Sequence, residues 1–165
     1  MKTQAKQNKQ VNFHNNTKEE YDYVASNEQL GRDKVKKLVG FLDEKNSTST
    51  TVTFTEGEYD RIDGYINGSP FDVKYRYNNI DKYNSQQITI GKFNALIRIA
   101  KREGAKSAVY IVCFQDGYYL IFDLMKIDTK GLGTMSGRWS KVSSEVMHNY
   151  LLPNNLGITI KPICT

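Results

Sequence analysis

Residues 59–77 decide the fold, and they read YDRIDGYINGSPFDVKYRY. Within them, Asn67-Gly68 separates two runs in which apolar and polar side chains alternate. An Asn-Gly pair between alternating runs is the strongest short-range signal for a β-hairpin, because both residues tolerate the positive φ angles of a tight turn. The stretch therefore predicts two antiparallel strands, over 58–66 and 71–77.

The register of this hairpin would gather charged side chains on one face. If the turn has two residues, Ile66 pairs with Ser69 and Asp63 stands opposite Asp72, whereas a longer turn changes the pairing but keeps the faces. Lys74 shares that face with both aspartates. The other face suits a core, and it carries Ile62, Gly64, Ile66, Phe71, Val73 and Tyr75.

Two facing aspartates need something to offset their repulsion, which is about 3 kcal/mol at about 5 Å and an effective dielectric constant of about 20. A Mg²⁺ or Mn²⁺ ion would do so, because hard divalent cations prefer carboxylate oxygens and retain waters that can be activated. Lys74 would then orient the attacking water and stabilise charge on a phosphate. The alternative is an ordinary solvated hairpin face on which Arg61, Lys74 and Arg76 neutralise the acids.

Patterns along the rest of the chain predict the elements around the hairpin. Helices are predicted over 18–44 (one helix, or two broken at Gly31), 89–103 and 142–150. Further strands are predicted over 50–54, 108–114, 118–124 and 157–160, with a polar loop over 78–88 and a glycine-rich loop over 131–137. This order predicts an α/β (or α+β) fold with a mixed sheet, because a helix that returns to a buried strand makes a crossover connection.

Composition limits the class of protein. The 165 residues are 39% hydrophobic and 25% charged, which indicates a single packed domain over 18–165 preceded by a flexible basic arm over 1–17. The net charge of +5 favours an anionic partner. No apolar run approaches the roughly 18 residues of a membrane span, and the first residues do not resemble a secretory signal, so we expect a cytoplasmic protein. Two cysteines and two histidines argue against a disulfide framework or a zinc site.

Asp63, followed nine positions later by Asp72-Val73-Lys74, resembles the motif of the PD-(D/E)XK nuclease superfamily. The predicted order of elements is similar to that of its Holliday-junction resolvases and restriction endonucleases. The resemblance implies a restriction-endonuclease-like αβββαβ core over about residues 18–124, with a mixed central sheet flanked by helices. The sequence departs from the family pattern in three ways: no proline precedes Asp63, Asp72 stands where glutamate is commoner, and Phe93 stands where resolvases often have glutamine.

The resemblance also implies an activity, namely Mg²⁺- or Mn²⁺-dependent hydrolysis of DNA phosphodiester bonds. Asp63 and Asp72 would be the metal-binding carboxylates, and Lys74 the catalytic lysine. Many members add a glutamate from the first helix, for which we choose Glu20, with Glu19 and Glu28 as alternatives. Many members also act as dimers, so a homodimer is expected.

Basic side chains near this site are candidates for contact with the DNA backbone. They are Arg61, Arg76, Lys92, Arg98, Lys101, Arg102, Arg138 and Lys141. The sequence does not distinguish a DNA substrate from an RNA substrate. A second hypothesis is a catalytically inactive protein of the same fold that binds DNA or another protein, of the kind that phages and mobile elements encode.

Overall fold

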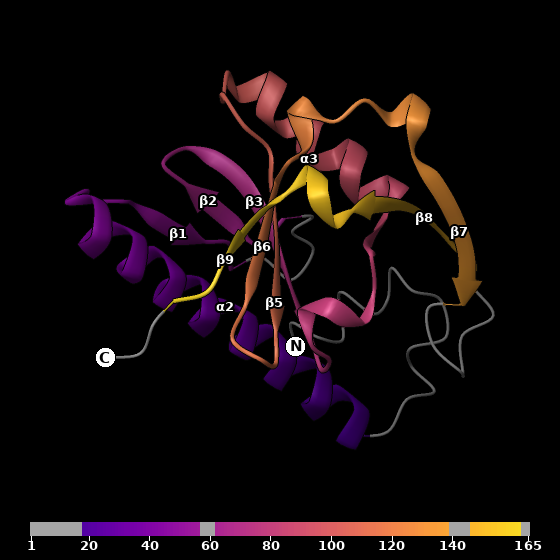
Figure 1. Ribbon diagram of the computed structural model, residues 1–165, viewed down its shortest axis with the longest axis horizontal. Helices are drawn as coiled ribbons and strands as arrows, with labels where there is room; N and C mark the ends of the chain where they lie inside the picture. The colour runs from indigo at the N-terminus through magenta and orange to yellow at the C-terminus, as the bar shows by residue number, and fades with distance from the viewer. Residues whose placement is uncertain (1–17, 57–61, 139–145, 163–165) are drawn as a thin grey trace.

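The computed structural model describes residues 18–56, 62–138 and 146–162, with the backbone alone for 18–25 and Arg138. In these residues the chain is an α/β protein with two helices, a six-stranded mixed sheet and a three-stranded antiparallel sheet (Figure 1). The helices are α2 (Lys18–Asn46) and α3 (Ile90–Glu103). Short 3-10 helices lie at Ile80–Lys82, Leu124–Lys126, Thr129–Gly131 and Asn154–Leu156.

The larger sheet contains six strands, in the spatial order β1 (Val52–Phe54), β2 (Gly64–Ile66), β3 (Ser69–Arg76), β5 (Val109–Phe114), β6 (Tyr119–Asp123) and β9 (Ile158–Ile160). β3 and β5 run parallel, and the other neighbours are antiparallel. The smaller sheet contains β4 (Ser85–Thr89), β8 (Val146–Pro153) and β7 (Gly133–Arg138). The predicted mixed sheet, with a helix crossing over to a buried strand, is therefore confirmed.

The β2–β3 hairpin has the predicted two-residue turn. Asn67 and Gly68 have φ angles of 48° and 82°, both positive as a type I′ turn requires, and Ile66 pairs with Ser69. The pairing holds as far as Gly64 opposite Phe71 and then changes. The Asp63 N–H also donates to the Phe71 carbonyl, at 2.9 Å, which is one residue out of step with that pairing. Such an offset is what a β-bulge produces.

The two helices cover opposite faces of the larger sheet (Figure 1). Val35 and Leu38 of α2 pack with Phe71 in one core cluster, and Phe93 and Leu96 of α3 pack in the other cluster. The clusters draw on alternate residues of β5 and β6, because successive side chains of a strand point to opposite faces. The sheet is thus buried on both sides at its centre.

One face assignment from the sequence was wrong. Ile62 was expected beside Phe71, but it is buried in the cluster on the α3 side. The physical reason is the offset at Asp63, since a shift of one residue moves a side chain to the other face of a sheet. Ile66, Val73 and Tyr75 pack on the α2 side with Phe71, as predicted.

Predictions for the helices and the C-terminal region were mixed. α2 is one helix, unbroken at Gly31, and α3 begins after Thr89 and ends before Gly104 as expected. The loops predicted over 78–88 and 131–137 contain β4 and β7, and the helix predicted over 142–150 is wrong because Val146–Pro153 forms β8. These strands pair between segments far apart in sequence, which local patterns do not reveal. The edge strand predicted near 157–160 is β9.

Gly64 is required where the hairpin changes register. A Cβ at this position would lie 2.0 Å from the Thr53 carbonyl oxygen and 2.9 Å from the Phe71 ring, so the backbone would have to move.

Gly64→Ala should therefore lower the free energy of unfolding by about 2 kcal/mol or more, because overpacking destabilises the folded state. Gly40→Ala is the matched control, because a Cβ on that exposed helix position meets nothing within 4 Å and should stabilise α2 by up to about 1 kcal/mol. Urea denaturation measures both, and equal effects would contradict the requirement at Gly64.

Candidate active site

The acidic pair lies where the β2–β3 ladder changes register, on the face covered by α3. Asp72 lies on β3 next to Tyr110 of β5, and only 9% of its surface is exposed. Asp63 directly precedes β2, and its Oδ2 accepts the Val73 N–H at 2.8 Å. This hydrogen bond holds the Asp63 carboxylate against β3. The backbone around the hairpin therefore fixes the position of both carboxylates.

Lys92 reaches the pair from α3. Thr89 caps this helix by accepting the Lys92 N–H on its hydroxyl oxygen at 3.2 Å, which fixes the first turn. The Lys92 ammonium lies 3.0 Å from Asp72 Oδ1 in a partly buried ion pair. Sequence reasoning placed Lys92 among the candidates for DNA contact, and the structure places it directly on a candidate metal ligand.

Burial and like charge act together on Asp72. The pKa of Asp72 is raised to about 7, first by removal from water and then by the nearby negative charge of Asp63 and a hydrogen bond with it, while Lys92 acts in the opposite direction. A carboxyl with this pKa binds and releases a proton near neutral pH. The acidic pair therefore has negative charge that Lys92 neutralises only in part.

Lys74 lies two residues beyond Asp72 on the same face of β3. Its pKa is lowered, first by loss of hydration and then by the positive charges of Arg76 and Lys92, while Asp72 and Asp63 act in the opposite direction. Lys74 as a whole residue is exposed, so a ligand can approach its side chain. A lysine that gives up its proton more readily is suited to general acid–base work.

A second layer of hydrogen bonds ties β4 to this face. The Tyr110 hydroxyl donates to the Gln87 carbonyl oxygen at 2.9 Å, and Arg76 donates to the same oxygen at 3.4 Å. Burial raises the pKa of Tyr110, so its hydroxyl stays protonated and remains a donor. Sequence reasoning missed Gln87 because it lies in the segment predicted as a loop.

The carboxylates fit a hard divalent cation. Mg²⁺ is commonly held through one or two carboxylates and keeps several waters, and a buried, partly neutralised pair supplies that set. Among the described side chains, no group of three His, Cys, Asp or Glu residues is placed to hold a metal. A metal here would thus depend on two carboxylates, on waters and on the substrate.

Glu20, the expected third acid, has a described backbone but no described side chain, and the same is true of Glu19. Both lie at the start of α2, the helix on the other face of the sheet. A Cβ at Gly31 of α2 would lie 3.2 Å from Val73, and Glu20 lies about 16 Å before Gly31 along the helix axis at about 1.5 Å per residue. The backbone of Glu20 is therefore not beside the acidic pair.

The other candidates for DNA contact are spread over several surfaces. Arg98, Lys101 and Arg102 are exposed on α3, and Arg102 lies 3.4 Å from Glu103. Arg61 and Lys141 lie outside the described residues, as does the side chain of Arg138.

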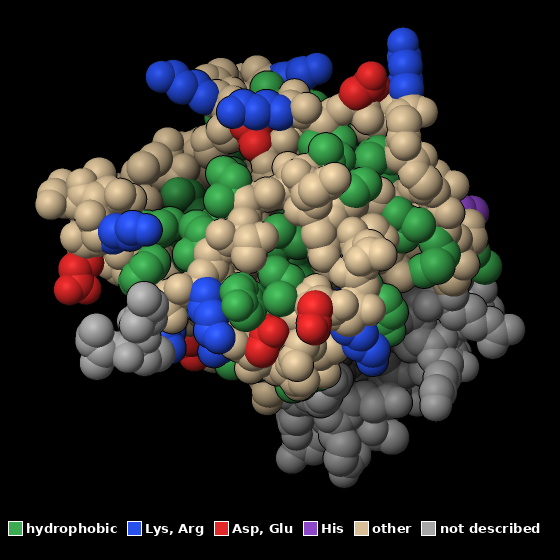
Figure 2. All heavy atoms as spheres, viewed as in Figure 1, with side chains coloured by type: hydrophobic (Ala, Val, Ile, Leu, Met, Phe, Trp, Pro, Cys, Tyr) green, Lys and Arg blue, Asp and Glu red, His purple; other side chains and the backbone are tan. Residues whose placement is uncertain are grey.

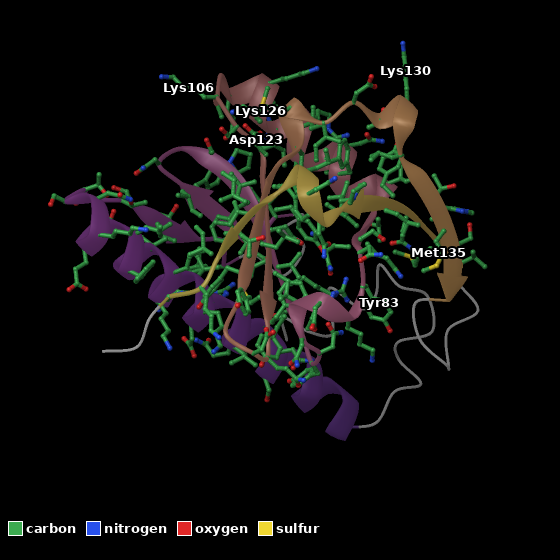
Figure 3. The ribbon with its side chains drawn as sticks, in the orientation of Figure 1. Tyr83, Lys106, Asp123, Lys126, Lys130 and Met135 are labelled. Carbon is green, nitrogen blue, oxygen red and sulfur yellow. The ribbon has the colours of Figure 1, made fainter. Side chains whose placement is uncertain are left out.

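Positive charge also gathers at one end of the molecule that the sequence did not single out. Lys106, Lys126 and Lys130 are exposed there, where the turn after α3 meets the short helices after β6 (Figure 3). Figure 2 shows lysine and arginine side chains along this upper edge. The Asp123 carboxylate at the same end is turned inward, accepting the backbone N–H groups of Ala108 and Met125.

A cavity of about 350 Å³ lies on the other side of the sheet from the acidic pair. It is lined by Lys34, Lys37, Asp116, Gly117, Tyr119, Lys161 and Pro162. None of the residues of the acidic site lines it. The acidic site therefore lies outside this cavity.

Comparison with known proteins adds no assignment: the sequence matches no protein-family model and no curated protein. Across the described part of the chain, neither helix combines the length and apolar character needed to cross a membrane.

The raised pKa of Asp72 predicts a pH-dependent stability. Because the pKa is about 7 in the folded protein and about 4 in an unfolded chain, the folded state binds more protons between these values. The free energy of unfolding should therefore fall as pH rises through this window, and Asp72→Asn should remove that fall. Urea denaturation in EDTA at pH 5 and pH 8 measures it, with the exposed Asp81→Asn as the matched control. A fall of the same size in Asp72→Asn and in the parent would contradict the assignment.

Proposed function

We propose that this protein is a metal-dependent nuclease of the PD-(D/E)XK type that hydrolyses DNA phosphodiester bonds. The observation that carries the proposal is the hydrogen bond that holds Asp63 against β3, beside the buried Asp72 and on the face that presents Lys74. This is the Asp, Asp-x-Lys arrangement that the motif implies. The raised pKa of Asp72 supports the proposal, since such shifts are common at active sites.

The architecture supports the same proposal. A helix, three antiparallel strands, a second helix and a strand parallel to the third follow one another as α2, β1, β2, β3, α3 and β5. Apart from β4, which lies between β3 and α3, this order is similar to the αβββαβ order that the family resemblance implies.

In this proposal each residue has a separate role. Asp63 and Asp72 would hold Mg²⁺ or Mn²⁺, which supplies water activation and charge neutralisation when bound. Lys74 donates to the phosphate or to the attacking water from the open side of the site, and stabilises the charge that develops on the phosphate. The buried position of Asp72 keeps its carboxylate from turning away into solvent.

A polyanion such as DNA is the substrate class that the charge distribution favours. The chain carries a net charge of +5, and exposed basic side chains lie on α3 and at the end that bears Lys106, Lys126 and Lys130. A homodimer is part of the same proposal, through the family resemblance alone.

A second candidate function is a catalytically inactive nuclease fold that binds DNA or a protein. The Asp72–Lys92 ion pair favours it, because two lysines and two aspartates can balance one another in the site without a metal ion. Metal binding separates the two functions, since the inactive module would bind its partner and take up no divalent cation.

Lys74→Ala and Asp72→Ala should each lower the rate of DNA cleavage by about 100-fold or more, because the first removes a cation that stabilises charge on the reacting phosphate and the second removes a metal ligand. The assay measures cleavage of plasmid, linear, single-stranded and branched DNA in Mg²⁺. Lys45→Ala, on an exposed position in the last turn of α2, is the matched control and should cleave like the parent. Parental cleavage by either site variant would show that its residue has been assigned wrongly.

Metal binding should raise the midpoint of thermal unfolding, because an ion that binds only the folded state stabilises it by mass action. Millimolar Mn²⁺ is expected to raise the midpoint of the parent, and EDTA to reverse the rise and abolish cleavage. Asp63→Asn should lose the rise, and the exposed Asp33→Asn on α2 should keep it. A Mn²⁺ effect that persists in Asp63→Asn would place the metal elsewhere.

A further inference from the structure

The ion pair between Lys92 and Asp72 occupies the position at which a metal would bind. The Lys92 ammonium lies 3.0 Å from Asp72 Oδ1, and 29% of the Lys92 side chain is exposed against 13% of the Asp72 side chain. Both groups therefore have only limited access to water, and the ion pair compensates part of the charge of each. A divalent cation bound to the same carboxylate would lie within a few ångströms of the ammonium.

The helix cap constrains the backbone of Lys92 more than its side chain. The Thr89 cap fixes the Lys92 N–H, whereas the ammonium is at the end of a flexible four-carbon stem. The ammonium can therefore leave Asp72 while α3 stays in position. Since Lys92 is partly exposed, it has room to turn toward a ligand on the open side of the site.

We propose that Lys92 is the resident counter-ion of Asp72 and competes with the divalent cation for it, so that a polyanionic substrate which draws Lys92 away strengthens metal binding. The proposal rests on the proposed function, because it concerns the same metal site. It makes Lys92 a positioning residue that couples two events, the arrival of DNA and the loading of metal. Coupling of this kind is reciprocal, so metal should also strengthen DNA binding.

The first test measures Mn²⁺ affinity without DNA by isothermal titration calorimetry. Lys92→Met, which keeps much of the stem and removes the charge, should bind Mn²⁺ at least about 10-fold more tightly than the parent. Arg98→Met is the matched control, because it removes a positive charge from an exposed position of the same helix, and its affinity should be close to that of the parent. Lys92→Arg keeps the charge and should also bind like the parent.

The second test adds a short DNA duplex in the Lys74→Ala background, where cleavage is suppressed. The duplex should tighten Mn²⁺ binding in the protein that retains Lys92, and that gain should shrink in the Lys74→Ala, Lys92→Met double variant. Circular dichroism and thermal unfolding confirm that each variant is folded. Lys92→Gln repeats both measurements should Lys92→Met fail to fold.

The outcomes separate this inference from the proposed function. Equal or weaker Mn²⁺ binding in a folded Lys92→Met overturns the competition, and leaves the nuclease proposal standing if Asp63→Asn abolishes binding. An undiminished gain from DNA in the double variant overturns the coupling. No Mn²⁺ uptake by the parent or by Lys92→Met overturns the metal site, and with it both proposals.

Discussion

The hydrogen bond from the Val73 N–H to the Asp63 carboxylate is the contact on which the site depends. It exists because the β2–β3 ladder changes register at Asp63. In the regular ladder Phe71 pairs with Gly64, but the Phe71 carbonyl also accepts the N–H of Asp63. Bulges of this kind re-aim a side chain, and they are common beside active sites. Gly64 permits the offset, because no Cβ fits between its backbone and Thr53. One local irregularity thus sets a second carboxylate beside Asp72.

The acidic pair then constrains the charges around it. Burying a carboxylate next to another one is unfavourable unless a proton, a cationic side chain or a metal ion compensates. This chain supplies two lysines from different elements, Lys74 from β3 and Lys92 from α3. They are not equivalent: Lys92 is partly buried against Asp72, whereas Lys74 is exposed and open to a ligand. The site can therefore keep the Lys92 ammonium on Asp72 while Lys74 remains accessible to a substrate.

The sequence predicted those parts of the structure that local chemistry determines. The Asn67-Gly68 turn requires positive φ angles, and α3 has a capping threonine and a terminal glycine, so both were predicted correctly. The offset at Asp63 could not be predicted, because period-two alternation assumes an unbroken ladder. The Asp72–Lys92 ion pair was missed for a different reason: it depends on where α3 packs, and a charged residue at a helix start looks the same whether it faces solvent or a carboxylate.

Through the smaller sheet, the position of Lys92 also depends on the C-terminal region of the chain. β4 leads directly into α3, and Thr89 is both its last residue and the cap of the helix. β4 is held by pairing with β8, more than 50 residues later, and by the bond from Tyr110 to the Gln87 carbonyl. The place of Lys92 over Asp72 thus follows from strands that carry none of the motif. Long-range strand pairing, and not the local sequence around Asp72, thus determines which cation meets the Asp72 carboxylate.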